Sequence, residues 1–419
     1  MSEDNSQYTR SKVQPKDFIS GWMMALIIAG TGLTLPILYL GSEIALGVGF
    51  KDALTAFIVS TIVLTVLCMI TTIIGNRSRL STYMILHFSF GSQGAKIINF
   101  IFGITLLGWF SVGLELLAIA IKDTGQQMLE INLLEWPIIV FIGILIVITT
   151  VYGIKSLERL ANFAVPLLTL FLFYVVYMAL KSTPSETIFA FVPEEASFTL
   201  FEAIAILVGS SILFPVLMAD FSRFAYNDKH SLIAVLGITL GFPMALLFSA
   251  IPSISTAEVD IIKVMEQLEL VLPAFALLLV STWVGSASNL YSTTLTFSTV
   301  FSAGTYKLVT ILCGGCGIIV ALLGFSNYLF DFLNFLGILS PAISAIYILN
   351  FFWVKKQRYI LNERKDWEYS ALICWLLSSL IACLTYYDVF QLTHVYFLDS
   401  FLLGGLLYGL SSKLPSLYN

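Results

Sequence analysis

The chain has 419 residues, of which 58% are hydrophobic and only 11% are charged, and its mean hydropathy is +0.92. These values lie far outside those of soluble domains and predict an integral membrane protein. The net charge of −5 comes without a basic stripe, so no nucleic-acid partner is expected.

Apolar segments long enough to cross a bilayer, which takes about 20 residues, recur along the whole chain. They number about twelve and predict an all-α integral membrane fold. They lie at about residues 18–46, 52–74, 95–121, 137–153, 157–180, 200–224, 231–254, 270–300, 306–325, 328–354, 367–386 and 392–411.

The basic residues determine the predicted orientation of these spans, because Lys and Arg collect in cytoplasmic loops. With the N-terminus inside, all 21 basic residues except Lys51, Lys122, Lys181 and Lys263 fall on the cytoplasmic side. Adding or removing one span would destroy this asymmetry. We therefore expect a multi-pass protein of the plasma (inner) membrane with both termini in the cytoplasm. The polar N-terminal segment has no short apolar core before a cleavage site, so no signal peptide is expected.

Two spans are predicted to be broken helices. The segments "IIAGTGLTLPILYLGSE" (27–43) and "LVGSSILFPVLMADF" (207–221) interrupt apolar runs with glycines, hydroxyls and a proline. They belong to the first and sixth spans, which correspond to each other if spans 1–5 and 6–10 are the halves of an inverted repeat. Paired broken helices of this kind indicate a binding site near the middle of the membrane in a secondary transporter.

This reading divides the chain into five parts. They are a cytoplasmic tail (1–17), a transporter core (18–354) with spans 1–5 at 18–180 and spans 6–10 at 200–354, a basic cytoplasmic loop (355–366), spans 11 and 12 (367–412) and a cytoplasmic tail (413–419).

The eighth span carries many hydroxyl groups, in "STWVGSASNLYSTTLTFS" (281–298). Thr282, Ser286, Asn289 and Thr293 follow one another at intervals of four, three and four residues, so they share one helical face. Single Ser and Thr residues often bond carbonyls of their own helix, and an Asn often bridges to a neighbouring helix. A whole polar face instead favours the lining of a cavity, since polar groups at membrane depth are costly.

The segment "CGGC" (313–316) has the spacing of a redox or zinc motif, but no second pair of ligands accompanies it. Close packing between helices explains neighbouring glycines better, so we expect no metal and no cofactor there. No Ser-His-Asp, HExxH, Walker or Rossmann pattern is present, and the chain is not expected to be an enzyme.

Six segments resemble, in order and spacing, the nucleobase:cation symporter-1 family and within it the cytosine permease branch. The resemblance extends over about residues 20–410, and "FSFG" followed by "GWFxVG" is fairly specific. The segments are "RLSTYMILHFSFGSQGAK" (79–96), "LLGWFSVG" (106–113), "LVGSSI" (207–212), "ADFSRF" (219–224), "STWVGSASNLYSTTLTFS" (281–298) and "LNFFWVKKQRY" (349–359).

The resemblance implies a leucine-transporter-like fold, with a 5+5 inverted repeat and two additional C-terminal helices. It also implies alternating access and the import of a nucleobase or related heterocycle together with a cation. Trp109 matches the aromatic residue of the third span that stacks on the base, and stacking suits any flat heterocycle. Ser210, flanked by Gly209 and Ser211, matches a serine of the family's substrate pocket.

Several positions differ from the family pattern. The family has glutamine where Leu106 stands, an aromatic residue where Ser211 stands, and asparagines near Ser286 and Ser288. A site that hydrogen-bonds its substrate loses much affinity when such partners are absent. These differences predict a less polar or bulkier heterocycle than cytosine. Asn289 lies one position beyond the family's nearest asparagine. It is a candidate substrate residue because it lies on the polar face of the eighth span, and not because of the resemblance.

The resemblance also implies a sodium site, between backbone carbonyls that match Gly32 and Leu35 of the first span and Ser281 of the eighth. The two adjacent hydroxyls that complete it in the family are replaced here by Val284 and Gly285. A hard cation needs several oxygen ligands. Ser286 or Thr282 could replace the pair only if the helix were rotated.

Glu115 stands in the third span where the family usually has a small apolar residue. An acid inside the membrane is a common proton carrier, so one hypothesis is that a proton on Glu115 has replaced sodium. The alternative is a carboxylate near the outer end of the span that reaches water or pairs with a neighbouring span.

The function predicted from the sequence is a secondary active transporter that imports a small planar nitrogen heterocycle by alternating access, with Na⁺ or H⁺ as coupling ion. Lipid and the transported molecule are the expected partners, and a monomer is expected. Two alternatives remain open, a non-transporting sensor on the same fold and a transporter of another solute such as an amino acid.

Overall fold

The computed structural model describes residues 12–129, 131–152, 155–268, 270–300, 306–360 and 365–412. These residues form helices joined by short loops, and their β-type pairing is limited to one isolated bridge between Ile19 and Ala225. The predicted all-α class is therefore confirmed.

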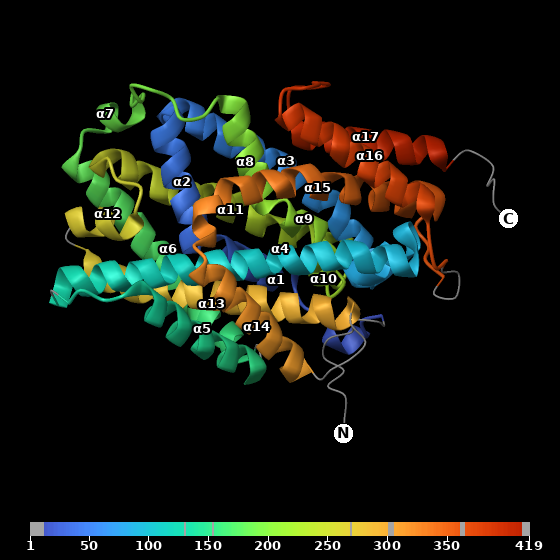
Figure 1. The fold of residues 1–419 in the computed structure, drawn as a ribbon, viewed down its shortest axis with the longest axis horizontal. Coiled ribbons are helices and arrows are strands. Elements are labelled where there is room, and N and C mark those ends of the chain that lie inside the picture. The colour runs from blue at the N-terminus through green and yellow to red at the C-terminus, as the bar shows by residue number, and fades with distance from the viewer. Residues whose placement is uncertain are drawn as a thin grey trace.

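Every predicted span contains a helix or a group of short helices (Figure 1). The first half of the core consists of α1 (Gly21–Gly32), α2 (Leu35–Val48), α3 (Phe50–Ser78), α4 (Thr82–Leu129), α5 (Glu135–Tyr152) and α6 (Lys155–Ser182). The second half consists of α8 (Leu200–Ser211), α9 (Leu213–Val216), α10 (Met218–Ser222), α11 (Asp228–Thr256), α13 (Val271–Val300), α14 (Tyr306–Leu322) and α15 (Leu329–Leu349). The last two spans are α16 (Tyr369–Tyr386) and α17 (Tyr396–Ser411).

The remaining elements are short. A π-helical turn (Asn350–Val354) continues α15, and the connecting segments contain η2 (Pro15–Asp17), α7 (Ser185–Phe189), α12 (Ile261–Gln267) and η3 (Phe325–Tyr328). Within the described residues, five helices are long and apolar enough to cross a bilayer, and the bent pair α1 and α2 makes a sixth if it is counted as one span. Shorter apolar helices lie within α5, α6, α8, α14 and α17.

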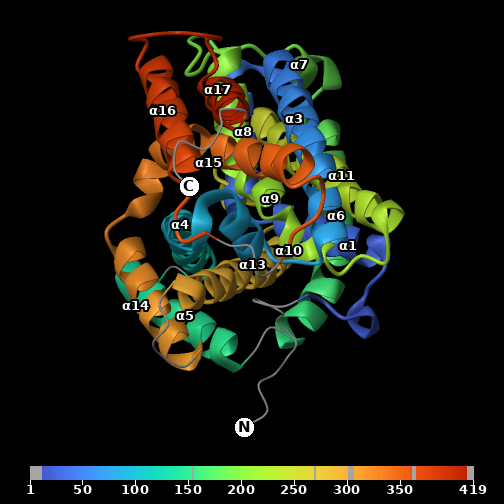
Figure 2. The ribbon, with the colours of Figure 1, turned by 90° about the vertical axis from the view of Figure 1, so that its right-hand side faces the viewer.

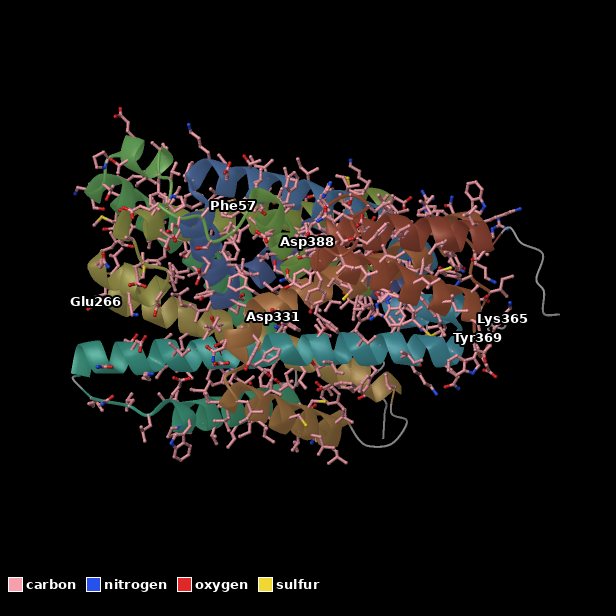
Figure 3. All side chains as sticks on the ribbon, turned by 45° about the horizontal axis from the view of Figure 1, so that its top comes forward. Phe57, Glu266, Asp331, Lys365, Tyr369 and Asp388 are labelled. Carbon is pink, nitrogen blue, oxygen red and sulfur yellow. The ribbon has the colours of Figure 1, made fainter. Side chains whose placement is uncertain are left out.

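The helix α4 runs along the long axis of the molecule and indicates the direction of the bundle (Figure 1). Figure 3 shows Glu266, in a predicted outer segment, and Lys365, in the predicted cytoplasmic loop, at opposite ends of this axis. In the perpendicular view, α16 and α17 lie beside α15 on one side of the bundle, and α5 and α14 lie on the other (Figure 2).

Both predicted breaks are present. Between α1 and α2 the first span bends by 65°, and Pro36 explains the break because it has no N–H to donate to the carbonyl of Gly32. In the sixth span α8 ends at Ser211, and two short helices follow with interruptions at Ile212 and Leu217. The sharper break, in the first span, frees backbone groups that a regular helix would pair.

Arg79 connects several segments at the end where α3 finishes. It caps α3 in the left-handed conformation, with φ of 59°. Its guanidinium donates hydrogen bonds to the carbonyl oxygens of Arg223 (3.0 Å), Ala225 and Tyr226 (3.2 Å), and it lies 4.1 Å from the ring centre of Phe18. The N-terminal segment, α3 and the loop after α10 are joined in this way.

Candidate substrate and ion-coupling site

The break of the first span lies against the hydroxyl-rich part of α13. The hydroxyl of Ser281 donates a hydrogen bond to the carbonyl oxygen of Leu33, in the break itself. The backbone N–H of Leu35, at the start of α2, donates to the hydroxyl oxygen of Thr282 at 3.4 Å. Both α13 residues are buried, at 4% and 1% exposure. The freed backbone groups therefore have protein partners in place of lipid, as membrane depth requires.

The next turn of α13 packs closely on both neighbours. A Cβ added at Gly285 would lie 2.8 Å from the Cγ2 methyl of Thr34, so α13 approaches the break with no room for a further side chain. A Cβ added at Gly113 of α4 would lie 2.5 Å from the hydroxyl oxygen of Ser286. Ser286 is buried and faces α4 at that point.

Trp109 lies on α4, one turn before Gly113. Its indole is half-buried and meets the ring of Phe332 edge to face, with ring centres 5.8 Å apart. Phe332 in turn meets Phe325 edge to face at 5.3 Å. Gly108 makes room for this group, because a Cβ there would lie 2.8 Å from Phe332. The tryptophan is thus part of an aromatic group, and a flat ligand would meet a preformed aromatic surface.

The end of α8 packs against the residue that follows Phe332. A Cβ added at Gly209 would lie 2.3 Å from the carbonyl oxygen of Leu333, so this glycine serves the contact between α8 and α15. The hydroxyl of Ser210 donates to the carbonyl of Leu207 at 2.7 Å, and it lies 3.4 Å from the half-buried hydroxyl of Ser211. Ser210 therefore bonds within its own helix here.

These contacts bring most of the predicted substrate residues to one region. The adjacent residues Phe332 and Leu333 of α15 contact Trp109 and Gly209 respectively, and α2 packs against α4, α8 and α13. Leu106 is buried in the apolar core on α4. Asn289 is half-buried on α13, and its backbone carbonyl accepts a hydrogen bond from Thr293 at 2.8 Å.

Glu115 is buried, at 3% exposure, and both of its carboxylate oxygens are bonded to one residue. They accept hydrogen bonds from the backbone N–H of Ser326 at 2.7 Å and from its hydroxyl at 2.6 Å. Ser326 lies in η3, between α14 and α15. Glu115, in the third span, thus binds the connection that precedes the tenth span.

The break fits a sodium ion poorly. Of the predicted ligand residues, Ser281 directs its hydroxyl proton at Leu33, and Ser286 faces α4. Three of the predicted ligands are backbone carbonyls, those of Gly32, Leu35 and Ser281, and the hydrogen bond from the N–H of Leu35 to Thr282 does not involve them. Val284 and Gly285 supply no side-chain oxygen. A hard cation prefers six or more oxygen ligands, and this part of α13 does not provide them.

The "CGGC" segment shows the expected close packing at one of its two glycines. A Cβ added at Gly314 would lie 2.2 Å from Val147 of α5, whereas Gly315 has nothing within 4 Å. Cys313 and Cys316 are free thiols.

Sequence reasoning missed the partners of the candidate residues more often than the residues themselves. Phe325, at the end of predicted span 9, and Phe332, in span 10, could not be distinguished from their apolar neighbours, because aromatic residues are frequent throughout the chain. Ser326 lies in the short connection between two spans, where a single serine does not predict a contact. The close approach at Gly285 was not predicted either, since close helix packing was predicted from the sequence only for the glycines of "CGGC" (313–316).

Comparisons with known proteins agree with this geometry. The model of a family described as permease for cytosine/purines, uracil, thiamine, allantoin matches residues 9–388. The cytosine permease of Escherichia coli (strain K12) is 30% identical over 371 residues, which are 87% of this chain and 83% of that protein. The hydantoin permease of Microbacterium maritypicum is 25% identical over 300 residues, 65% of this chain and 60% of that protein.

The fold is also similar to that of solved transporters. Mhp1, a nucleobase-cation-symport-1 family transporter, in a closed conformation with bromovinylhydantoin bound, superposes with a TM-score of 0.82 at 19% identity, over 97% of this chain and 94% of Mhp1. Its inward-facing conformation superposes with a TM-score of 0.85 at 18% identity, over 96% and 92%. A Na⁺-coupled sialic acid symporter gives 0.71 at 12% identity, over 98% and 92%. These likenesses confirm the predicted transporter fold.

Proposed function

The chain belongs to the family of permeases for cytosine/purines, uracil, thiamine and allantoin, and we propose that it imports a nucleobase-like planar heterocycle, driven by a cation. It is an integral membrane transporter and not an enzyme. Import proceeds by alternating access, in which the two halves of the fold expose one central site to each side in turn.

The half-buried indole of Trp109 is the observation that carries the substrate class. It lies beside Phe332 of α15, whose neighbour Leu333 contacts Gly209 of α8, and a flat ring could stack there on an aromatic surface. An amino acid without an aromatic side chain would gain little from such a surface. This favours a heterocycle over the amino-acid alternative.

Differences from the family pattern suggest which heterocycle is preferred. Leu106 and Ser211 replace an amide and an aromatic ring, and with Gly209, Ser210, Ser286 and Asn289 they complete the proposed substrate site. Fewer amide partners reduce the affinity for a very polar base. We propose a ring less polar or bulkier than cytosine.

Two cation sites are proposed for the coupling. One is a proton on Glu115, supported by the burial of this acid inside the membrane, whereas its two hydrogen bonds from Ser326 fit the alternative of a carboxylate paired with a neighbouring segment. The other is sodium at the first break, with Gly32, Leu35, Ser281 and Ser286, and the hydrogen bonds of Ser281 count against it. We favour the proton. The proposed location is the inner membrane, with both termini cytoplasmic and the protein monomeric.

Uptake into proteoliposomes tests this function. Labelled cytosine, uracil, hypoxanthine and allantoin are offered separately, with either a sodium gradient or a proton gradient imposed. We expect at least one of them to accumulate above its external concentration when the proton gradient is present. Binding without accumulation would instead support the sensor, and no binding or uptake of all four would contradict the substrate class.

A further inference from the structure

Two hydroxyls of α13 bind the break of the first span, next to the backbone groups predicted as sodium ligands. We propose that Ser281 and Thr282 clamp the break between α1 and α2 directly, so that this chain holds its first span without sodium. The clamp itself does not depend on the proposed function. Its consequence, that the driving ion binds elsewhere, rests on the proposed cation-driven transport.

The first step concerns the carbonyl of Leu33. A carbonyl freed by a helix break inside a membrane needs a donor or a cation. Here the hydroxyl of Ser281 donates to it from a buried position, across 248 residues of sequence. The serine has one proton, and that proton is directed at the break, so its oxygen and the carbonyl are already joined without an ion.

The second step concerns the other side of the break. The N–H of Leu35 is left without a helical partner because it begins α2, and it donates to Thr282. This bond needs an acceptor, and a cation cannot provide one. The two neighbouring hydroxyls therefore satisfy one acceptor and one donor of the break.

The third step concerns the space beside these bonds. The next turn of α13 presents Gly285, whose added Cβ would lie 2.8 Å from the methyl of Thr34. Val284 next to it is a branched alkyl residue. Val284 and Gly285 thus add no side-chain oxygen to those of Ser281 and Thr282, whereas a hard cation needs several. Coupling by a proton on Glu115 is consistent with this arrangement.

Hydrogen–deuterium exchange of the break tests the clamp without any substrate. The purified protein in detergent micelles is exchanged in sodium chloride and in potassium chloride at equal ionic strength, and the peptides that cover residues 31–38 are compared. We expect the same exchange rate in both salts. Saturable slowing of exchange by sodium in this segment would overturn the proposal.

Variants identify the side chains responsible. Ser281→Ala should speed the exchange of residues 31–38 roughly fivefold, the effect of losing one hydrogen bond, and Ser281→Thr, which keeps the hydroxyl, should restore it. Thr294→Val is the matched control, because its hydroxyl bonds only Leu290 of the same helix. Equal effects of Ser281→Ala and the control would contradict the clamp.

The comparison of salts remains decisive if Ser281→Ala fails to fold, since it uses the unaltered protein. The readout also separates this proposal from the proposed function. A sodium effect on the break together with heterocycle uptake would reject the clamp alone, whereas a sodium-insensitive break without uptake of the four compounds would reject the substrate class alone.

Discussion

The carboxylate of Glu115 binds both the backbone N–H and the hydroxyl of Ser326, at 2.7 and 2.6 Å, although 211 residues separate them in sequence. Two hydrogen bonds to a charged acceptor are strong. They attach the loop before α15 to α4. Protonation of the carboxylate would remove one acceptor oxygen and weaken this attachment, which connects proton binding to the position of the tenth span.

Replacement of Glu115 by Gln should therefore change the coupling. We expect proton-driven accumulation to fall at least tenfold and the pH dependence of uptake to flatten, because an amide does not titrate. Uptake at several external pH values measures this. Asp52, an exposed acid in the first turn of α3, supplies the matched control, and Asp52→Asn should keep the pH profile. An unchanged profile in Glu115→Gln would dispose of the proton hypothesis.

Replacement of Trp109 by Ala should weaken substrate binding. Loss of an aromatic contact costs about 0.5–1.5 kcal/mol, so KM should rise about threefold to tenfold, while Trp109→Phe should lose less. Kinetics of uptake measure both. Trp136, which is 61% exposed at the start of α5, is the control. If Trp109→Ala and Trp136→Ala had the same KM, stacking on Trp109 would be refuted.

Replacement of Gly209 by Ala should destabilise the protein. The added Cβ would lie 2.3 Å from the backbone oxygen of Leu333, which cannot move without α15. Overpacking of this kind costs about 1–3 kcal/mol. Thermal unfolding in detergent should show a lower Tm. Gly315→Ala, where nothing lies within 4 Å, should leave the Tm unchanged or raised, since Ala favours the helix.

Replacement of Arg79 by Lys should destabilise the end of the bundle at which the Arg79 side chain binds three backbone carbonyls. A lysine keeps the charge but cannot reproduce the planar fork of donors. We expect a loss of about 1–2 kcal/mol in the free energy of unfolding, seen as a lower Tm. Arg77 is the control, because its ion pair with Asp228 at 2.7 Å is exposed and contributes about 0–1 kcal/mol. A larger effect in Arg77→Lys would contradict this ranking.

The sequence by itself determined the class of the protein, its helices, the two broken spans and the family. These features depend on local chemistry: the length of an apolar run decides whether it spans a bilayer, and Pro36 interrupts its helix whatever surrounds it. Trp109 could also be predicted as a substrate-binding residue, because the segment around it is specific to the family.

Only the tertiary structure decided what these residues contact. The polar face of α13 could be predicted from its period, but the period does not say which helix packs there. The structure shows that Ser281 and Thr282 bind the first break, and that Gly209 allows the close approach of α15. Glu115 found its partner in a loop. Each of these contacts joins segments more than 100 residues apart, and such pairings arise from the packing of whole helices, which no local pattern encodes.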